Sequence, residues 1–312
     1  MRKIYAIGET LFDIIFKDGQ PQAGKPGGAM LNSMVSLGRI GLPVSLISEY
    51  GDDDIGKIID KFLHDNGVDT CNTDHFRDGK TALAIAVLDE RNNASYTFYK
   101  NYPSRRLEME FPVIRKDDII LCGSIYAVTT EIRRRFIEFV SRAKANGALV
   151  VYDPNFRKSH LSDLESLRPL IVENMQMASL VRGSDEDFKN IFGAKDAGEA
   201  WSAIREFCPV LVYTSSTEGV YVRTPVFSGK FPVRKIAPVS TIGAGDNFNA
   251  GMITAIYNNG ITRDELDKMG EEMWNRIVST GVDFATDVCL SYENYISLAF
   301  ANKYLSASSD QI

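Results

Sequence analysis

Short apolar runs alternate with helical patterns along this 312-residue chain, and this alternation restricts the possible folds more than any other feature. The apolar runs end at glycine, aspartate or small polar residues, and they cover residues 4–7, 44–47, 119–122, 149–152 and 211–213. Between them, residues 52–66 and 133–144 repeat apolar side chains on one helical face. This pattern predicts an α/β fold with a doubly wound, mostly parallel sheet covered by helices on both faces.

Two segments depart from the alternation. Residues of about 11–26 and about 80–110 contain β-type runs with no helix after them, and the polar turn signal at 89–93 separates two of these runs. We expect residues 1–312 to form a single domain in which these segments build a small β lid over the ligand edge of the sheet. A surface elaboration with no part in binding is the alternative.

The net charge and the cysteines limit the possible partners and the cellular compartment of the protein. The net charge of −6 gives no general attraction to nucleic acid or to anionic membranes. No apolar stretch approaches the roughly 20 residues that span a bilayer. The four cysteines lie far apart without a C-x-x-C pair, which argues against structural zinc and fits a reducing compartment. We expect a cytoplasmic protein with small-molecule partners.

The run Gly243-Ala244-Gly245-Asp246 is the strongest chemical signal, because it directly precedes a helical pattern. Small residues at a helix start let several backbone N–H groups face one point, and the helix dipole favours an anion there. Asp246 in the first turn could then accept a proton from an attacking hydroxyl. The alternative is that Asp246 only caps the helix and the glycines ease packing.

A second motif, Gly27-Gly28 followed by Asn32, opens another apolar helical pattern. Paired glycines allow a ligand to approach the backbone, and Asn32 offers both a donor and an acceptor to a hydroxyl. Asp13, after the first strand, could accept hydrogen bonds from two sugar hydroxyls. Each of these residues also has a purely structural interpretation, as a buried polar residue at a helix start or as a solvated carboxylate.

Three weaker signals remain. Arg157, in the turn Asp153-Pro154-Asn155-Phe156-Arg157, could reach a phosphate or a sugar oxygen. Ser184 and Asp187 fit a helix cap first and a water-mediated Mg²⁺ contact second. The segment 214–219 is a polar strand-to-strand turn that could line a nucleotide site. Taken alone, each favours its structural interpretation.

Familiar nucleotide motifs are absent. The spacing of Gly19, Gly24 and Lys25 imitates a phosphate-binding loop, but Pro26 follows where Ser or Thr is needed, and we expect a turn there with no strand before it. The glycines at 243 and 245 fail the dinucleotide fingerprint because Phe248 stands at its third glycine. This argues against a nicotinamide-dependent dehydrogenase.

The ordered set of motifs resembles the ribokinase-like (PfkB) carbohydrate kinases, and in particular their fructokinase-like branch. The elements stand in family order over about residues 4–300. They are Gly8-Glu9-x-x-x-Asp13, Gly27-Gly28-Ala-x-x-Asn32, Gly38-Arg-Ile-Gly41, Gly51-Asp52-Asp53-x-x-Gly56, Asp153-Pro-Asn-x-Arg157, Ser184-x-x-Asp187 and Gly243-Ala-Gly-Asp246.

The resemblance implies transfer of the ATP γ-phosphate to a sugar hydroxymethyl group, with ATP and Mg²⁺ required and a homodimer formed through the β lid. It implies that Asp246 is the base and that the Gly243, Ala244 and Gly245 amides form the anion hole. The implied sugar contacts are Asp13, Gly27, Gly28, Asn32 and Arg157. The implied nucleotide contacts are Ser184, Thr214, Ser216, Gly219 and Asn275, and Asp187 is implied to reach the metal through water.

Three departures from the family pattern bear on these roles. Ser240-Thr241-Ile242 replaces the usual Asp-Thr-Thr, which argues against activation by a monovalent cation. Ser216 replaces the first glycine of the nucleotide turn. Ser184-x-x-Asp187 replaces Asn-x-x-Glu with a shorter acid.

Fructose is the expected substrate, since the Gly8-Glu9 start, the turn ending at Arg157 and the lid segment 96–100 resemble fructokinases more than ribokinases. A 2-keto-3-deoxygluconate kinase is the main alternative within the class, ahead of a nucleoside kinase. The departures also leave open a regulatory protein that binds sugar and nucleotide with little turnover.

Overall fold

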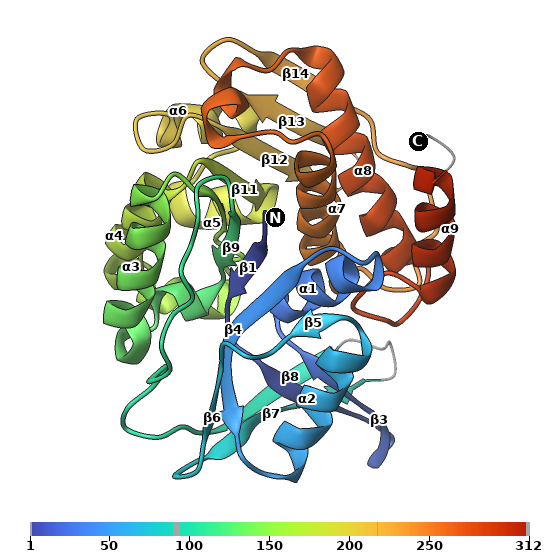
Figure 1. Ribbon diagram of the computed structural model, residues 1–312. Coiled ribbons are helices and arrows are strands. Elements are labelled where there is room, and N and C mark those ends of the chain that lie inside the picture. The colour runs from blue at the N-terminus through green and yellow to red at the C-terminus, as the bar shows by residue number, and fades with distance from the viewer. Residues whose placement is uncertain (1, 90–93, 217, 310–312) are drawn as a thin grey trace.

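The central feature of the computed structural model, which describes residues 2–89, 94–216 and 218–309, is one large twisted sheet (Figure 1). Its strands in spatial order are β14 (Ser228–Phe231), β13 (Gly219–Arg223), β12 (Leu211–Ser215), β11 (Leu180–Ser184), β10 (Leu149–Asp153), β9 (Ile119–Gly123), β1 (Ile4–Ile7), β4 (Val44–Gly51) and β5 (Val68–Asp69), with β6 (Thr73–Phe76) paired to the far part of β4. Strands β12 to β5 run parallel, and β13 and β14 are antiparallel.

Helices cover both faces of this sheet (Figure 1). On one face lie α1 (Ala29–Arg39), α2 (Asp54–Asp65), α7 (Ala244–Asn258), α8 (Glu271–Cys289) and α9 (Leu298–Ser309). On the other lie α3 (Thr130–Ala145), α4 (Leu164–Met177), α5 (Asp185–Phe192) and α6 (Ala197–Ile204). Short 3₁₀ turns occupy 125–128, 158–163 and 263–268. The predicted doubly wound architecture is confirmed.

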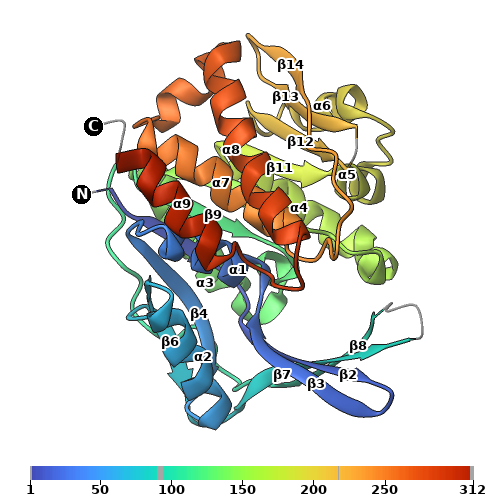
Figure 2. The same cartoon turned by 90° about the vertical axis from the view of Figure 1, so that its right-hand side faces the viewer.

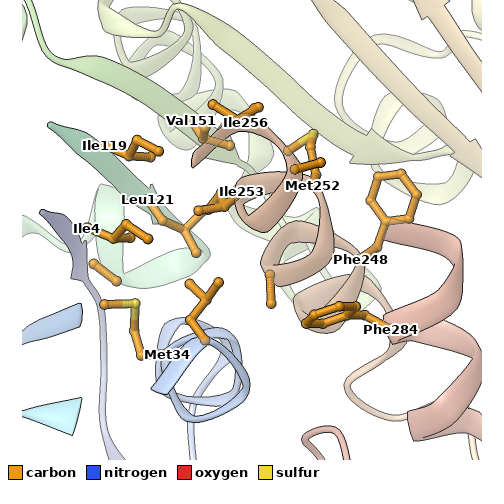
Figure 3. Packing of buried hydrophobic residues seen from close by; sticks show 14 of the residues in the cluster. Ile4, Met34, Ile119, Leu121, Val151, Phe248, Met252, Ile253, Ile256 and Phe284 are labelled. Atoms are coloured by element: carbon orange, nitrogen blue, oxygen red, sulfur yellow. The ribbon is translucent and has the colours of Figure 1, made fainter. Parts of the chain in front are cut away.

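Alternation along each strand builds two cores. In β1, Ile4 and Ala6 belong to the core under α7, whereas Tyr5 and Ile7 belong to the core under α3. This is the period-2 geometry of a sheet that is buried on both faces. Figure 3 shows Ile253 and its neighbours on α7 packed against Leu121 and other side chains of the central strands. The packing fixes α7 across the middle of the sheet.

A second, four-stranded sheet projects from the main body (Figure 2). Its strands in spatial order are β3 (Gln20–Gly27), β2 (Leu11–Lys17), β7 (Lys80–Leu88) and β8 (Ala94–Asn101). This sheet is the predicted lid, although its strands end at Asn101 rather than near 110. Part of the predicted hairpin turn, residues 90–93, lies outside the described residues. The turn expected over Gly19 to Lys25 is found at residues 18–19, but Gly24 and Lys25 lie in β3 and β2 precedes them, so that part of the prediction was wrong.

The described secondary structure also adds elements beyond the predicted ones. The strands and helices predicted around the main sheet correspond to β1, β4, β9, β10, β12, α1, α2, α3 and α7. Strand β11 and the short strands β5, β6, β13 and β14 were not identified individually from the sequence. Within the described residues no helix combines the length and apolarity needed to cross a membrane. All four cysteines are free thiols.

Candidate active site

A cavity of about 1270 Å³ opens at the carboxyl ends of β10, β11 and β12, where parallel α/β sheets bind ligands. The first turn of α7 forms one wall, through Gly243 to Asp246. The lid contributes Tyr96 and Phe98 from β8, and Arg157 lies nearby, after β10. Sheet, helix and lid therefore bring three distant parts of the sequence to one space.

The start of α7 is shaped by Gly243, whose φ of 78° lies in the left-handed region. A Cβ there would also lie 2.7 Å from the carbonyl oxygen of Asn294. The Ala244 amide donates to Thr241 O at 3.3 Å. Among the described residues, no backbone acceptor meets the amides of Gly243, Gly245 or Asp246. The first turn therefore keeps unpaired N–H groups next to the cavity, but Ala244, predicted to be one of the donors, already has a partner.

Asp246 is 7% exposed, and Asn32 on α1 donates to its Oδ2 over 2.8 Å. Ser33 holds the same segment by donating its Oγ to Asp246 O at 2.7 Å. Burial raises the pKa of Asp246 to about 6, while the hydrogen bond from Asn32 lowers it. The other polar atom of Asn32, Oδ1, is buried and accepts no hydrogen bond from the part of the chain that the structure describes. The structure thus pairs two predicted site residues that stand 214 positions apart.

Of the predicted sugar contacts, Arg157 lines the main cavity, whereas Asp13, Gly27, Gly28 and Asn32 do not, and the first three of these lie toward the lid. Asp13 on β2 faces Gly27 so closely that a Cβ on Gly27 would overlap its carboxylate. Burial raises the pKa of Asp13 to about 6, and the nearby Lys25 ammonium lowers it. Gly28 has a φ of 136°, and a Cβ there would overlap the carbonyl of Glu9. Gly28 is therefore needed for the close approach of the chain before α1 to the backbone of Glu9, whereas Gly27 leaves room for the Asp13 carboxylate.

The predicted nucleotide residues divide into two groups. Thr214, Ser216 and Gly219 line the cavity at the β12–β13 hairpin, whose residue 217 lies outside the described residues. Ser184 lines it as well. Asn275 does not: it is exposed on α8, and that helix reaches the cavity only with residues 282–289. The first residue of α8 that lines the cavity therefore lies about two helical turns beyond the predicted Asn275.

Asp187 is committed to local hydrogen bonds. Its Oδ2 accepts from the Ser184 amide (2.7 Å) and hydroxyl (2.6 Å), and its Oδ1 accepts from the Phe156 amide (2.6 Å). These bonds cap α5 and hold the turn after β10. The described residues contain no group of three or more His, Cys, Asp or Glu side chains placed to hold a metal ion.

One cavity residue was missed by the sequence reasoning. Arg182 on β11 donates to Asp153 Oδ2 (2.9 Å) and to Thr214 Oγ1 (2.8 Å), and Asn249 on α7 donates to the same Asp153 oxygen (2.6 Å). The available signal was an arginine inside the run Leu180-Val181-Arg182-Gly183, just before the Ser184 cap. A charged residue in a buried parallel strand needs a buried partner, and Asp153 is that partner.

Comparisons with known proteins show which family and which relatives this chain resembles. A family profile described as "pfkB family carbohydrate kinase" matches residues 1–271. The chain is 28% identical over 277 residues to "Probable fructokinase-6, chloroplastic" of Arabidopsis thaliana, covering 84% of this chain and 72% of that protein. It is 25% identical over 281 residues to "Fructokinase-1" of Oryza sativa subsp. japonica, covering 86% and 87%.

Solved structures show the same fold. Fructokinase from Vibrio cholerae O395, crystallised with fructose, ADP and calcium ion, superposes with a TM-score of 0.83 at 22% identity, covering 98% of this chain and 99% of that chain. Aminoimidazole riboside kinase from Salmonella enterica, complexed with its riboside and an ATP analogue, gives 0.81 at 21% identity, covering 97% and 100%. The match of the family profile over most of the sequence shows that this chain belongs to the pfkB family of carbohydrate kinases.

Proposed function

We propose that the protein transfers the γ-phosphoryl group of ATP to a hydroxymethyl group of a sugar, and that fructose is the sugar. The observation that carries this proposal is the position of Asp246, a buried carboxylate at a cavity wall, beside the unpaired amides of the first turn of α7. The relatives named fructokinase support the choice of sugar.

In the proposed step, Asp246 takes the proton of the attacking hydroxyl. The sugar oxygen forms a bond to the γ-phosphorus as the bond from that phosphorus to the bridging oxygen breaks, and ADP leaves. The amides of Gly243, Gly245 and Asp246 would bind the charge that the phosphoryl oxygens carry. The Ala244 amide could join them only by giving up its 3.3 Å bond to Thr241.

The geometry supports a division of the site between the two substrates. Asn32, through its unpaired Oδ1, and Asp13 on the lid side are the proposed sugar contacts, with Arg157 at the edge of the pocket. The β12–β13 hairpin, with Thr214 and Gly219, is the proposed nucleotide contact. Mg²⁺ would neutralise charge on the nucleotide phosphates, and Asp187 would meet it only through water.

The test is a panel of sugars with ATP and Mg²⁺, measured by ADP release. Fructose should give the highest kcat/KM, and 2-keto-3-deoxygluconate, ribose and nucleosides should give lower values. A higher kcat/KM for one of these would replace fructose but keep the kinase reaction. Ligand-dependent thermal stabilisation without ADP release from any sugar would instead favour a regulatory binding protein.

We also propose that a second copy of this chain covers the outer face of the lid. Phe16, Ile85, Val87 and Tyr99 share that face, since their strand registers place them on the side opposite Asp13. Val87 is 50% exposed and Tyr99 61%. An exposed apolar sheet face of this kind is typical of an interface.

A further inference from the structure

Arg182 occupies an unusual position for a strand arginine. Arg182 lines the cavity, yet only 7% of its surface is exposed. It shares a strand face with Leu180, whose side chain packs in the core under α7, so the guanidinium extends toward that helix. Hydrogen bonds to Asp153 and Thr214 tie it to the ends of β10 and β12. The cation is therefore fixed before any ligand arrives.

The guanidinium lies against the first turn of α7. A Cβ on Gly245 would lie 2.8 Å from Nη1 and 3.3 Å from Nη2 of Arg182, so only a glycine allows this approach. The ring of Phe248, one turn along α7, lies 5.5 Å from the guanidinium carbon. The positive charge thus lies against Gly245, whose amide has no hydrogen-bond partner among the described residues.

The hydrogen bonds of Arg182 are incomplete. Its guanidinium has five N–H groups, and the described residues accept from one on Nη1 and one on Nη2. Nε is buried and has no partner among them. Asp153, in contrast, already accepts from Asn249 and from the Asn155 amide as well. Three N–H groups of Arg182 therefore have no acceptor among the described residues, next to the cavity that the residue lines.

We propose that Arg182 is a further catalytic residue, whose remaining N–H groups bind the transferring phosphoryl group from beneath the start of α7. This inference rests on the proposed kinase function. A planar guanidinium suits the oxygens of a phosphoryl group, and a cation held in advance by Asp153 and Thr214 needs no reorganisation during transfer. Arginines that contact a transferring phosphoryl group accelerate other phosphotransferases by about 10³–10⁵.

The test compares Arg182→Gln and Arg182→Lys with the wild-type enzyme. Arg133→Gln is the matched control, because Arg133 is a largely buried arginine that pairs with Glu173 away from the cavity. We expect Arg182→Gln to lower kcat by about 100-fold or more. Arg182→Lys should lower kcat by at least about 10-fold, because a single ammonium group cannot replace the planar guanidinium and its paired N–H donors. Arg133→Gln should keep kcat.

Calorimetric binding supplies a readout that a structural role would not change. Arg182→Gln should lower the affinity for a non-hydrolysable ATP analogue about 10-fold more than the affinity for ADP, because only the analogue carries the third phosphate. Equal weakening of both nucleotides with near-normal kcat would overturn the proposal. If Arg182→Gln does not fold, Arg182→Lys, which keeps the charge, decides by the same two measurements. If the wild-type enzyme itself releases no ADP, the proposed function fails, and the analogue-to-ADP ratio still tests Arg182.

Discussion

The Asp246 carboxylate experiences opposing influences on its protonation. Burial and the charge of Asp153 raise its pKa, whereas the hydrogen bond from Asn32 and the charges of Arg157 and Arg182 lower it, and the outcome is a pKa of about 6. The group is thus ionised near neutral pH but is a stronger base than a solvated carboxylate. Those are the properties that a general base for a sugar hydroxyl requires.

Replacing Asp246 with Asn should separate chemistry from stability. We expect Asp246→Asn to lower kcat at least about 100-fold with sugar affinity retained, measured by ADP release and by calorimetry. Because the folded state binds the Asp246 proton more tightly than the unfolded chain, ionisation of Asp246 destabilises the native protein as the pH rises through about 6. The variant should therefore be more stable than the wild type at pH 7, by up to about 3 kcal/mol.

That stability difference should shrink as the pH falls from about 6 toward about 4, because the folded protein takes up the Asp246 proton in this range while the unfolded chain, with an ordinary pKa of 3.8, stays largely ionised. Denaturant unfolding at pH 7 and pH 4.5 measures it. Near-normal turnover of the variant would remove Asp246 from the role of base.

The Asn32 contact gives a second prediction. Asn32→Ala should raise the sugar KM more than it lowers kcat, because it removes a proposed substrate contact. It should also move the acid limb of the kcat profile to a pH above about 6, since the hydrogen bond that lowers the Asp246 pKa is lost. Steady-state kinetics between pH 5 and 8 measure both effects. Asn258→Ala, an exposed change on the same helix as Asp246, should leave both unchanged, and a kcat loss without a KM change would contradict the sugar contact.

At the scale of the element, α7 is the part that positions the proposed chemistry. Residues 246–256 are buried without interruption, and even Asn247, Asn249 and Thr254 are fully enclosed. A helix enclosed all round is held by its neighbours, here the sheet, α1 and α8. Its first turn can therefore keep an unpaired set of amides without fraying.

Gly251 allows α7 and α8 to approach closely. A Cβ there would lie 2.8 Å from both the Thr280 carbonyl carbon and the Gly281 Cα, and these backbone atoms cannot rotate away. We expect Gly251→Ala to reduce the free energy of unfolding by about 1–3 kcal/mol. Gly270→Ala, at the start of α8 with no atom within 4 Å, should change it by less than about 0.5 kcal/mol. Equal effects in denaturant unfolding would refute the packing argument.

At the scale of the whole molecule, the lid is anchored at its base. Glu9, after β1, accepts from Lys100 (2.5 Å) and from Tyr102 (2.8 Å). Next to this, Glu49 accepts from Arg106 and from Tyr126 in a buried network. The base of the lid is thus tied to the ends of β1 and β4, while its outer face stays open to a partner.

The proposed dimer can be tested on that outer face. We expect the wild-type protein to be a dimer by light scattering at micromolar concentration, and Val87→Asp or Tyr99→Asp to shift it to monomer, because each places a charge in the interface. Val226→Asp, at a 68% exposed valine in the β13–β14 turn, should leave the mass unchanged. A monomeric wild-type protein would contradict the proposal.

The amino-acid sequence was sufficient to predict the sheet, its helical layers and the lid. In apolar runs such as 119–122 and periodic segments such as 133–144, a few neighbouring residues are enough to distinguish a strand from a helix, because the two structures repeat with different periods. Short or polar strands such as β5 and β6 have no such recognisable local pattern. Their pairing with β4 is what makes them strands.

The candidate site was only partly visible in the sequence. The motif at 243–246 and the position of Asn32 could be picked out, but only the tertiary structure decided that they meet, because α1 and α7 pack side by side. The same holds for Arg182 under Gly245, and for the exposed position of Asn275. Neighbouring residues determine the local periodicity. Contacts between distant side chains depend on strand order and helix packing, which cannot be deduced from any short segment.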